Sequence, residues 1–167
     1  MTSLPWFERN LTFGLPVNML PYYLERLAGT AVRFDAKIKD FSEADLSARL
    51  NDKWSVKQNI GHLAEVDEIA NKRVDEIISG VTIMSRAVFE PKDYNPWPIE
   101  KVLELFKVNR LQNLSKYQAL SASDLKKSSL HPRLKIQMTP IDLAWFDAEH
   151  DDHHLVAINE ILKTFYK

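Results

Sequence analysis

Four long segments of the chain repeat apolar residues at steps of three and four, and this periodicity restricts the fold more than any other feature. The segments span roughly residues 19–39, 55–79, 98–120 and 139–161. Such spacing places an apolar stripe along one side of a helix, and the stripe must be covered by another element. No strand pattern competes with these segments. The sequence therefore predicts an all-α fold whose four helices bury their stripes against one another.

Capping patterns indicate where two of these helices begin. Ser55 is followed three residues later by Gln58, which matches a capping box. Thr139 and Asp142 repeat the pattern, and Pro140 stands between them at the first helical position, where proline is favoured. The second and fourth helices are therefore predicted to begin directly after Ser55 and Thr139.

The connections between the helices differ in length, and this difference predicts the topology. Residues 81–97 separate the second helix from the third and contain Pro91 and Pro96. They are too long for a tight helical hairpin, so the second and third helices are expected to run parallel or to cross over. Residues 121–138 form a second polar connection. We expect one domain, a four-helix bundle that spans residues 1–167.

Composition excludes several classes of protein. The chain is 45% hydrophobic and 27% charged, as in ordinary soluble domains. Its net charge of −1 provides no basic surface for nucleic acid, and no apolar run approaches the roughly 20 residues that span a bilayer. Residues 1–10 lack the apolar centre of a signal peptide. Cysteine is absent, which excludes thiolate ligands and fits a reducing compartment, so we expect a cytoplasmic protein with no nucleic-acid or membrane partner.

The fourth helix carries two histidines on its apolar face. His150 and His154 share that face with Leu143 and Ile158. Side chains four residues apart leave a helix one turn from each other, so both imidazoles can reach one metal ion. A buried imidazole needs a partner for each ring nitrogen, and two neighbouring imidazoles are hard to satisfy without a metal or a carboxylate. The spacing alone leaves both possibilities open.

A third histidine, His62, lies on the flank of the second helix's apolar stripe. Three neutral imidazoles from two helices make an open site, in which water or substrate completes the coordination. Metal-bound histidines usually donate the second ring N–H to a carboxylate or carbonyl. Glu65, Asp147 and Asp151 each lie one turn from one of these histidines, and Asp67 is expected to face the core. We single out Glu65 and Asp147 as orienting groups or general bases; the alternative for Asp67 and Asp147 is a structural hydrogen bond to a histidine.

Two other histidines are weaker candidates for ligands. His131 stands beside a proline in the second connection. His153 is turned by about 100° around the helix from its neighbour His154. Both are expected to be surface or pocket residues.

The histidine segments resemble the DinB family, a damage-inducible group that includes YfiT-like proteins. The resemblance is carried by RLAGTAVR at 26–33, WSVKQNIGHL at 54–63, residues 131–132 and 139–143, and EHDDHHLVAI at 149–158. It spans nearly the whole chain. It implies a four-helix bundle in up-down-down-up order, with a long crossover between the second and third helices. It also implies a divalent metal, with Zn²⁺ or Ni²⁺ the leading choices, held by His62, His150 and His154.

The resemblance further implies an enzyme, since relatives of this kind include metal-dependent hydrolases and thiol-dependent transferases or isomerases. The ion would lower the pKa of a bound water or thiol and make it a nucleophile near neutral pH. Because the chain has no cysteine, any thiol must be a low-molecular-weight cosubstrate that acts on a small-molecule substrate. A homodimer formed through helix faces is also implied. The alternative function is that of a non-catalytic, metal-binding protein of a stress response.

Overall fold

The computed structural model describes residues 4–51, 53–90 and 92–165. Its body consists of the helices α1 (Leu20–Ile38), α3 (Val56–Ile78), α4 (Ile99–Gln118) and α5 (Pro140–Leu162). The shorter elements are the 3-10 turns η1 (Trp6–Glu8), η2 (Val17–Met19) and η3 (Asp124–Lys126), the helix α2 (Glu43–Ser47), and the strands β1 (Ser129–Leu130) and β2 (Gln137–Met138). The four predicted helices are confirmed.

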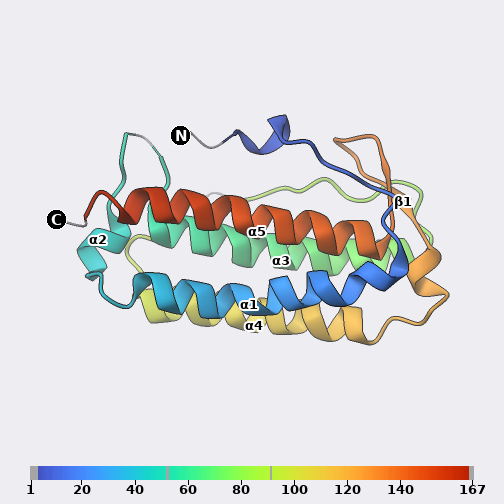
Figure 1. Cartoon of the computed structure of the whole chain (residues 1–167), viewed down its shortest axis with the longest axis horizontal. Coiled ribbons are helices and arrows are strands. Elements are labelled where there is room, and N and C mark those ends of the chain that lie inside the picture. The colour runs from blue at the N-terminus through green and yellow to red at the C-terminus, as the bar shows by residue number, and fades with distance from the viewer. Residues whose placement is uncertain (1–3, 52, 91, 166–167) are drawn as a thin grey trace.

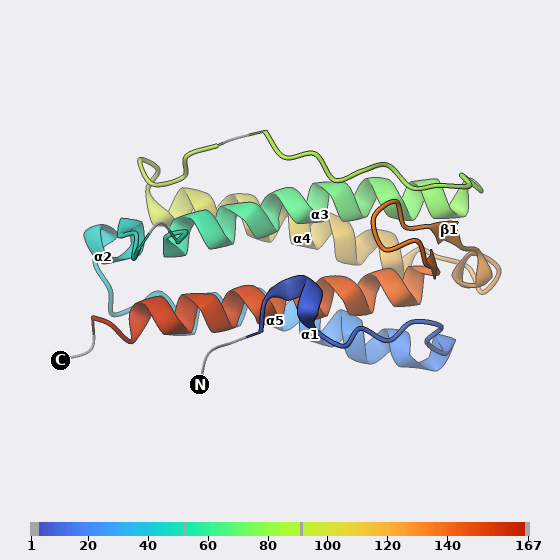
Figure 2. The ribbon, with the colours of Figure 1, turned by 90° about the horizontal axis from the view of Figure 1, so that it is seen from above.

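The four long helices form a bundle in which α1 and α5 run in one direction and α3 and α4 in the other (Figure 1). Helix α3 packs against α4 and α5, and α1 packs against α5 and α4. The order is therefore up-down-down-up, as expected. The crossover, residues 79–98, returns along the outside of α3 to the start of α4 (Figure 2). Within the described part of the chain, no helix is long and apolar enough to cross a membrane.

Both predicted capping boxes are present. The Ser55 hydroxyl accepts a hydrogen bond from the backbone N–H of Gln58, whose side chain accepts one from the Ser55 N–H. Thr139 and Asp142 exchange the same pair of hydrogen bonds at the start of α5. Such a cap is worth about 1 kcal/mol. Because α3 and α5 carry the three histidines, these caps also help to define where the imidazoles lie.

The apolar stripes form two buried clusters. One contains Phe34 and Phe106. The other contains Leu27 and Tyr117. Between the residues of the two clusters, each long helix contributes at least one buried polar side chain to the interior. The bundle is therefore divided by a layer of polar side chains across its middle.

We call this group the polar layer: Thr30, Asp67, Arg110 and Asp151, one from each long helix and all buried. The Nε of Arg110 donates to both carboxylate oxygens of Asp67 at 3.0 and 2.9 Å. Its Nη1 and Nη2 donate to Asp151 at 2.5 and 3.0 Å, and the Thr30 hydroxyl donates to Asp151 at 2.6 Å. Asp67 is thus the partner of a guanidinium, and the prediction that it could bind a histidine is wrong.

The second connection contains a short hairpin that the sequence did not predict. Strands β1 and β2 pair antiparallel, with Ser129 opposite Met138. Ile83 of the crossover forms a bridge with Leu130. Strands of two residues are too short to show an alternating pattern in the sequence. The hairpin ties the crossover to the segment that leads into α5.

Candidate metal centre

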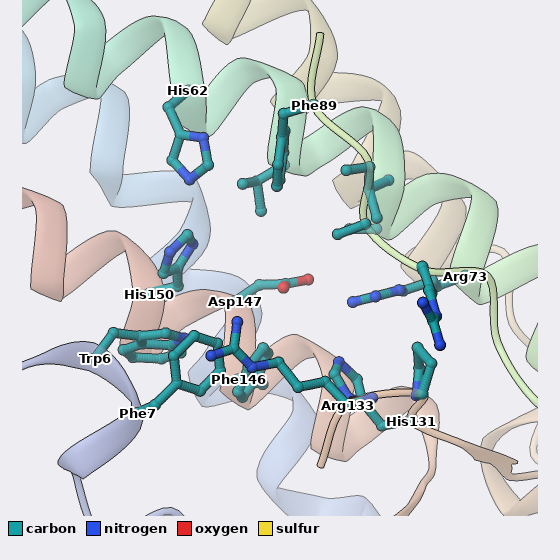
Figure 3. Close-up of a pocket in the computed structure, with 16 residues that line it drawn as sticks. Trp6, Phe7, His62, Arg73, Phe89, His131, Arg133, Phe146, Asp147 and His150 are labelled. Atoms are coloured by element: carbon teal, nitrogen blue, oxygen red, sulfur yellow. Dashed lines mark hydrogen bonds between the residues drawn. The ribbon is translucent and has the colours of Figure 1, made fainter. Parts of the chain in front are cut away.

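Three histidines face one another between α3 and α5, and Figure 3 shows the rings of His62 and His150 pointing toward each other. One ring nitrogen from each of His62, His150 and His154 lies within 4.8 Å of the other two. The Nε2 atoms of His150 and His154 are 3.2 Å apart. Tetrahedral zinc with Zn–N bonds of about 2.0–2.1 Å places its ligand nitrogens about 3.3 Å apart. This pair already has that spacing, and a His62 nitrogen lies within 4.8 Å of both members.

Asn59 orients one of these imidazoles. Its side-chain N–H donates to the carbonyl of Ser55 at 2.8 Å, so its Oδ1 is the atom that lies 2.7 Å from His154 Nδ1. The Nδ1 therefore carries the hydrogen, and the lone pair of Nε2 points at His150. Two ring nitrogens 3.2 Å apart need a proton or a cation between them. The donors present fit a metal that prefers nitrogen ligands.

Burial keeps the three imidazoles neutral. It lowers the pKa of His62 to about 4 and that of His150 to about 3, with the neighbouring histidines adding to the effect at His150. Burial also lowers the pKa of His154 well below its ordinary value. A histidine binds a metal only in its neutral form. At neutral pH, the three side chains are thus in the protonation state that a metal requires.

Aromatic rings enclose the three histidines. The Trp54 ring stacks on His154 with centroids 5.9 Å apart and 14° between the planes. Phe89 packs on His62 with a centroid distance of 4.7 Å. Trp6 of the N-terminal segment packs on His150 at 4.8 Å. These rings contribute to the burial that lowers the pKa values of the three imidazoles.

Cavities lie on two sides of the histidines. The first has a volume of about 600 Å³ and reaches His62 and His150 (Figure 3). Its aromatic walls are Trp6, Phe7, Phe89 and Phe146, and its polar walls are Arg73, Arg86, His131, Arg133 and Asp147. The second has a volume of about 720 Å³ and reaches His154. The N-terminal segment contributes to both, since residues 4–5 line the second cavity and residues 6–7 line the first.

The two predicted carboxylates lie in different surroundings. Asp147 lines the first cavity, and its Oδ2 has no hydrogen-bond partner among the described residues. Burial, followed by the charge of Asp67, raises the pKa of Asp147 to about 8. Glu65 accepts a hydrogen bond from the Tyr94 hydroxyl at 2.7 Å and lines neither of the two cavities. Asp147 is thus beside the histidine centre, whereas Glu65 holds the crossover.

The two weaker histidine candidates both line cavities. His131 is buried, and its Nδ1 accepts hydrogen bonds from the backbone N–H groups of Arg133 and Leu134 at 3.3 and 3.1 Å. His153 lies 5.8 Å from the Trp6 ring, centroid to centroid, and lines the second cavity. Neither belongs to the group of three histidines that can share one ion.

Several residues of the site had no signal in the sequence. Asn59 lies one turn before Leu63 on α3, and its role appears only because α5 packs beside it. Trp6, Arg73 and Arg133 come from segments far apart in the chain and meet at the first cavity. No residue spacing relates them. The one local pattern in the sequence is that Asn59 stands three positions before His62, although its side chain contacts His154.

Fold and site together define a class of protein, a four-helix bundle with a three-histidine candidate metal centre between two of its helices. Residues 26–158 match the DinB superfamily. This stretch is most of the chain, and the protein belongs to the DinB superfamily. A search of curated proteins finds no match.

Two solved structures share the fold. One is YfiT from Bacillus subtilis, described as a probable metal-dependent hydrolase with an unusual four-helix bundle topology. The TM-score is 0.81 at 16% identity, over 94% of this chain and 93% of that one. The other is the mycothiol-dependent maleylpyruvate isomerase, with a TM-score of 0.67 at 12% identity. That match covers 89% of this chain and 63% of the isomerase chain. At these identities the similarity concerns the fold alone.

Proposed function

We propose that this protein is a metal-dependent enzyme in which His62, His150 and His154 hold a divalent ion, Zn²⁺ or Ni²⁺. The observation that carries the proposal is the 2.7 Å contact between Asn59 Oδ1 and His154 Nδ1, which directs the free lone pair of that imidazole to the centre of the group. A metal site needs such an orienting partner. Bound there, the ion would supply Lewis-acid activation of a water or a thiol.

Asp147 is the residue we propose for proton transfer. It lies one turn before His150 on α5, lines the first cavity, and has one carboxyl oxygen without a protein partner among the residues described. Its pKa of about 8 leaves the carboxyl group largely protonated at neutral pH. It would then donate a proton to a leaving group, or accept one after it has been deprotonated. Glu65 is proposed as a positioning residue that acts through Tyr94 and the crossover.

The reaction we favour combines two reactants, a small-molecule substrate and a low-molecular-weight thiol. The two cavities support this choice, because one reaches His150 and the other reaches His154. The chain has no cysteine of its own. Hydrolysis is the second candidate, and the description of YfiT as a probable metal-dependent hydrolase favours it. A non-catalytic role in metal binding would leave a 600 Å³ cavity beside the histidines without a use.

The proposal includes a homodimer in the cytoplasm. Val32 of α1 and Val108 and Leu111 of α4 are 68%, 47% and 66% exposed. They lie within a turn of an exposed ion pair, Lys107 with Asp35, which joins the same two helices. Exposed apolar side chains on neighbouring helices favour burial against a second copy. The absence of cysteine fits a reducing compartment.

Metal analysis of untagged protein tests the proposal. Wild type should retain one ion per chain, whereas His150→Ala should bind Zn²⁺ at least roughly 100-fold more weakly, because it loses a direct ligand. His153→Ala is the matched control, since it removes a histidine from the same helix and should keep the ion. The metal-loaded protein is then assayed with thiol-transfer and hydrolase substrates. A metal-free wild type whose thermal stability ignores added Zn²⁺ would refute the proposal.

A further inference from the structure

The first cavity contains more positive than negative charge. Three arginines line it, Arg73, Arg86 and Arg133, against the single carboxylate Asp147. The imidazole that faces them, His131, is neutral because burial lowers its pKa to about 4. The cavity that leads to the histidine centre is therefore cationic at one end.

Arg73 is the buried member of the three, at 6% exposure. Its Nε and Nη2 both donate to one acceptor, the carbonyl oxygen of Ser85, at 3.4 and 3.2 Å. A guanidinium has five N–H donors, so most of them have no acceptor within the described residues. The Arg110 guanidinium, which is also buried, binds two carboxylates and a carbonyl. Arg73 differs in that it lines the cavity and its remaining donors have no acceptor among the described residues.

Arg86 and Arg133 are exposed and stand on different segments. Arg86 belongs to the crossover and Arg133 to the β1–β2 loop, and the bridge between Ile83 and Leu130 holds the two segments together. The Arg133 guanidinium lies over the Phe7 ring, 3.5 Å from its centroid. Neither guanidinium donates a hydrogen bond to another part of the described chain, so both remain available to a ligand.

We propose that this end of the cavity binds the oxyanion of an organic substrate, a carboxylate or a phosphate ester. Guanidinium groups bind both anions through paired N–H···O hydrogen bonds. The apolar body of the substrate would lie against the aromatic walls, with its reacting part toward His62 and His150. This last step rests on the proposed function, whereas anion binding by the arginines does not.

The test compares three small probes of similar shape: benzoate, phenyl phosphate and the neutral benzamide. Their dissociation constants are measured by ligand-observed NMR with Zn²⁺-loaded protein and again after chelation. At least one anion should bind roughly tenfold or more tightly than benzamide, as expected for hydrogen bonds between charged groups. Whichever anion binds more tightly identifies the source of the oxyanion. Equal binding of all three probes would overturn the proposal.

Two double variants distinguish anion binding by the arginines from anion binding by the metal ion. Arg86→Gln with Arg133→Gln removes two exposed charges, so the fold should survive, and the preference for the anion should fall several-fold while Arg73 keeps the remainder. Lys126→Gln with Lys135→Gln removes the same charge outside the cavity and should keep the preference. A preference that is unchanged in the arginine variant and disappears after chelation would assign it to the ion and contradict the inference. A preference that depends on the arginines in protein that binds no metal would support the inference and refute the proposed function.

Discussion

The polar layer and the histidine centre lie side by side in the bundle, and they differ in how their polar groups are satisfied. In the polar layer, Arg110 donates four hydrogen bonds to the carboxylates of Asp67 and Asp151 and one to the carbonyl of Leu27, all at 2.5 to 3.0 Å. In the histidine centre, His150 and His154 face each other with the nitrogens that would bind a metal. Opposite charges balance each other in the first group, whereas the second brings neutral imidazoles together.

This contrast separates two reasons for placing polar groups inside a bundle. Buried polar groups are normally hydrogen-bonded within the protein, and the exceptions need an explanation. Asp151 and His150 are adjacent in sequence and both lie in α5, so their positions in the helix do not show that they belong to different groups. The partners on the facing helices do: a guanidinium for Asp151, and another imidazole, His62, for His150. We infer that the polar layer holds the helices together and that the histidine centre serves function.

Removal of the guanidinium from the polar layer should have the largest effect on stability. Arg110→Met leaves two buried carboxylates without a counter-charge, and the free energy of unfolding should fall by about 3–5 kcal/mol. Lys107→Met, which removes an exposed lysine from the same helix, should cost at most about 1 kcal/mol. Urea denaturation of the metal-free proteins measures both. Equal losses in the two variants would show that the polar layer does not stabilise the bundle.

Much of the fold was predictable because its signals are local. The apolar stripes and the capping boxes at Ser55 and Thr139 depend on residues within a turn or two of each other. They therefore predicted where these helices begin. The bundle order followed from the length of the crossover and the family resemblance. The hairpin was missed because a strand of two residues has no period. Periodicity along one helix carries no information about which residue of the next helix lies opposite.

The candidate site divides in the same way. The pair His150 and His154 was predictable from spacing along one helix, and the structure brings His62 to them; that the three bind a metal stays a prediction. The orienting group was not predictable, because Asn59 and His154 are 95 residues apart and meet only through packing. Proximity in sequence pointed to carboxylates instead. One of them, Asp67, is taken by Arg110.

A change at Asn59 should test whether the histidine centre is built for a metal. Asn59→Leu removes the acceptor for His154 Nδ1, and Zn²⁺ affinity should fall by about 10–100-fold, the usual cost of losing such a partner. Asn59→Asp keeps an oxygen there and should retain the affinity. The matched control is Asn113→Leu, because Asn113 is also buried but its amide has no hydrogen bond in the described chain. Competition with a chromophoric chelator measures the affinities. Equal affinities in both leucine variants would contradict the assigned role.

His131 offers the smallest and most specific test, because it belongs to neither group. Its pKa is about 4 in the folded protein and 6.5 as an ordinary value, since burial and nearby arginines disfavour the charged form. Between these values the unfolded chain binds a proton that the folded chain does not, so stability falls as the pH is lowered from 6.5 to 4. Because the ring lines the first cavity rather than the closed core, we expect a loss of about 1–2 kcal/mol.

His131→Asn isolates this contribution. Asparagine keeps an acceptor for the backbone N–H groups of Arg133 and Leu134 but does not titrate. The variant should therefore lose about 1–2 kcal/mol less than wild type over the same pH range, while the histidine centre contributes equally to both. Denaturation of metal-free protein at several pH values supplies the comparison. If the free energy of unfolding changes with pH in the same way in both proteins, His131 does not contribute to the pH dependence and the prediction is wrong.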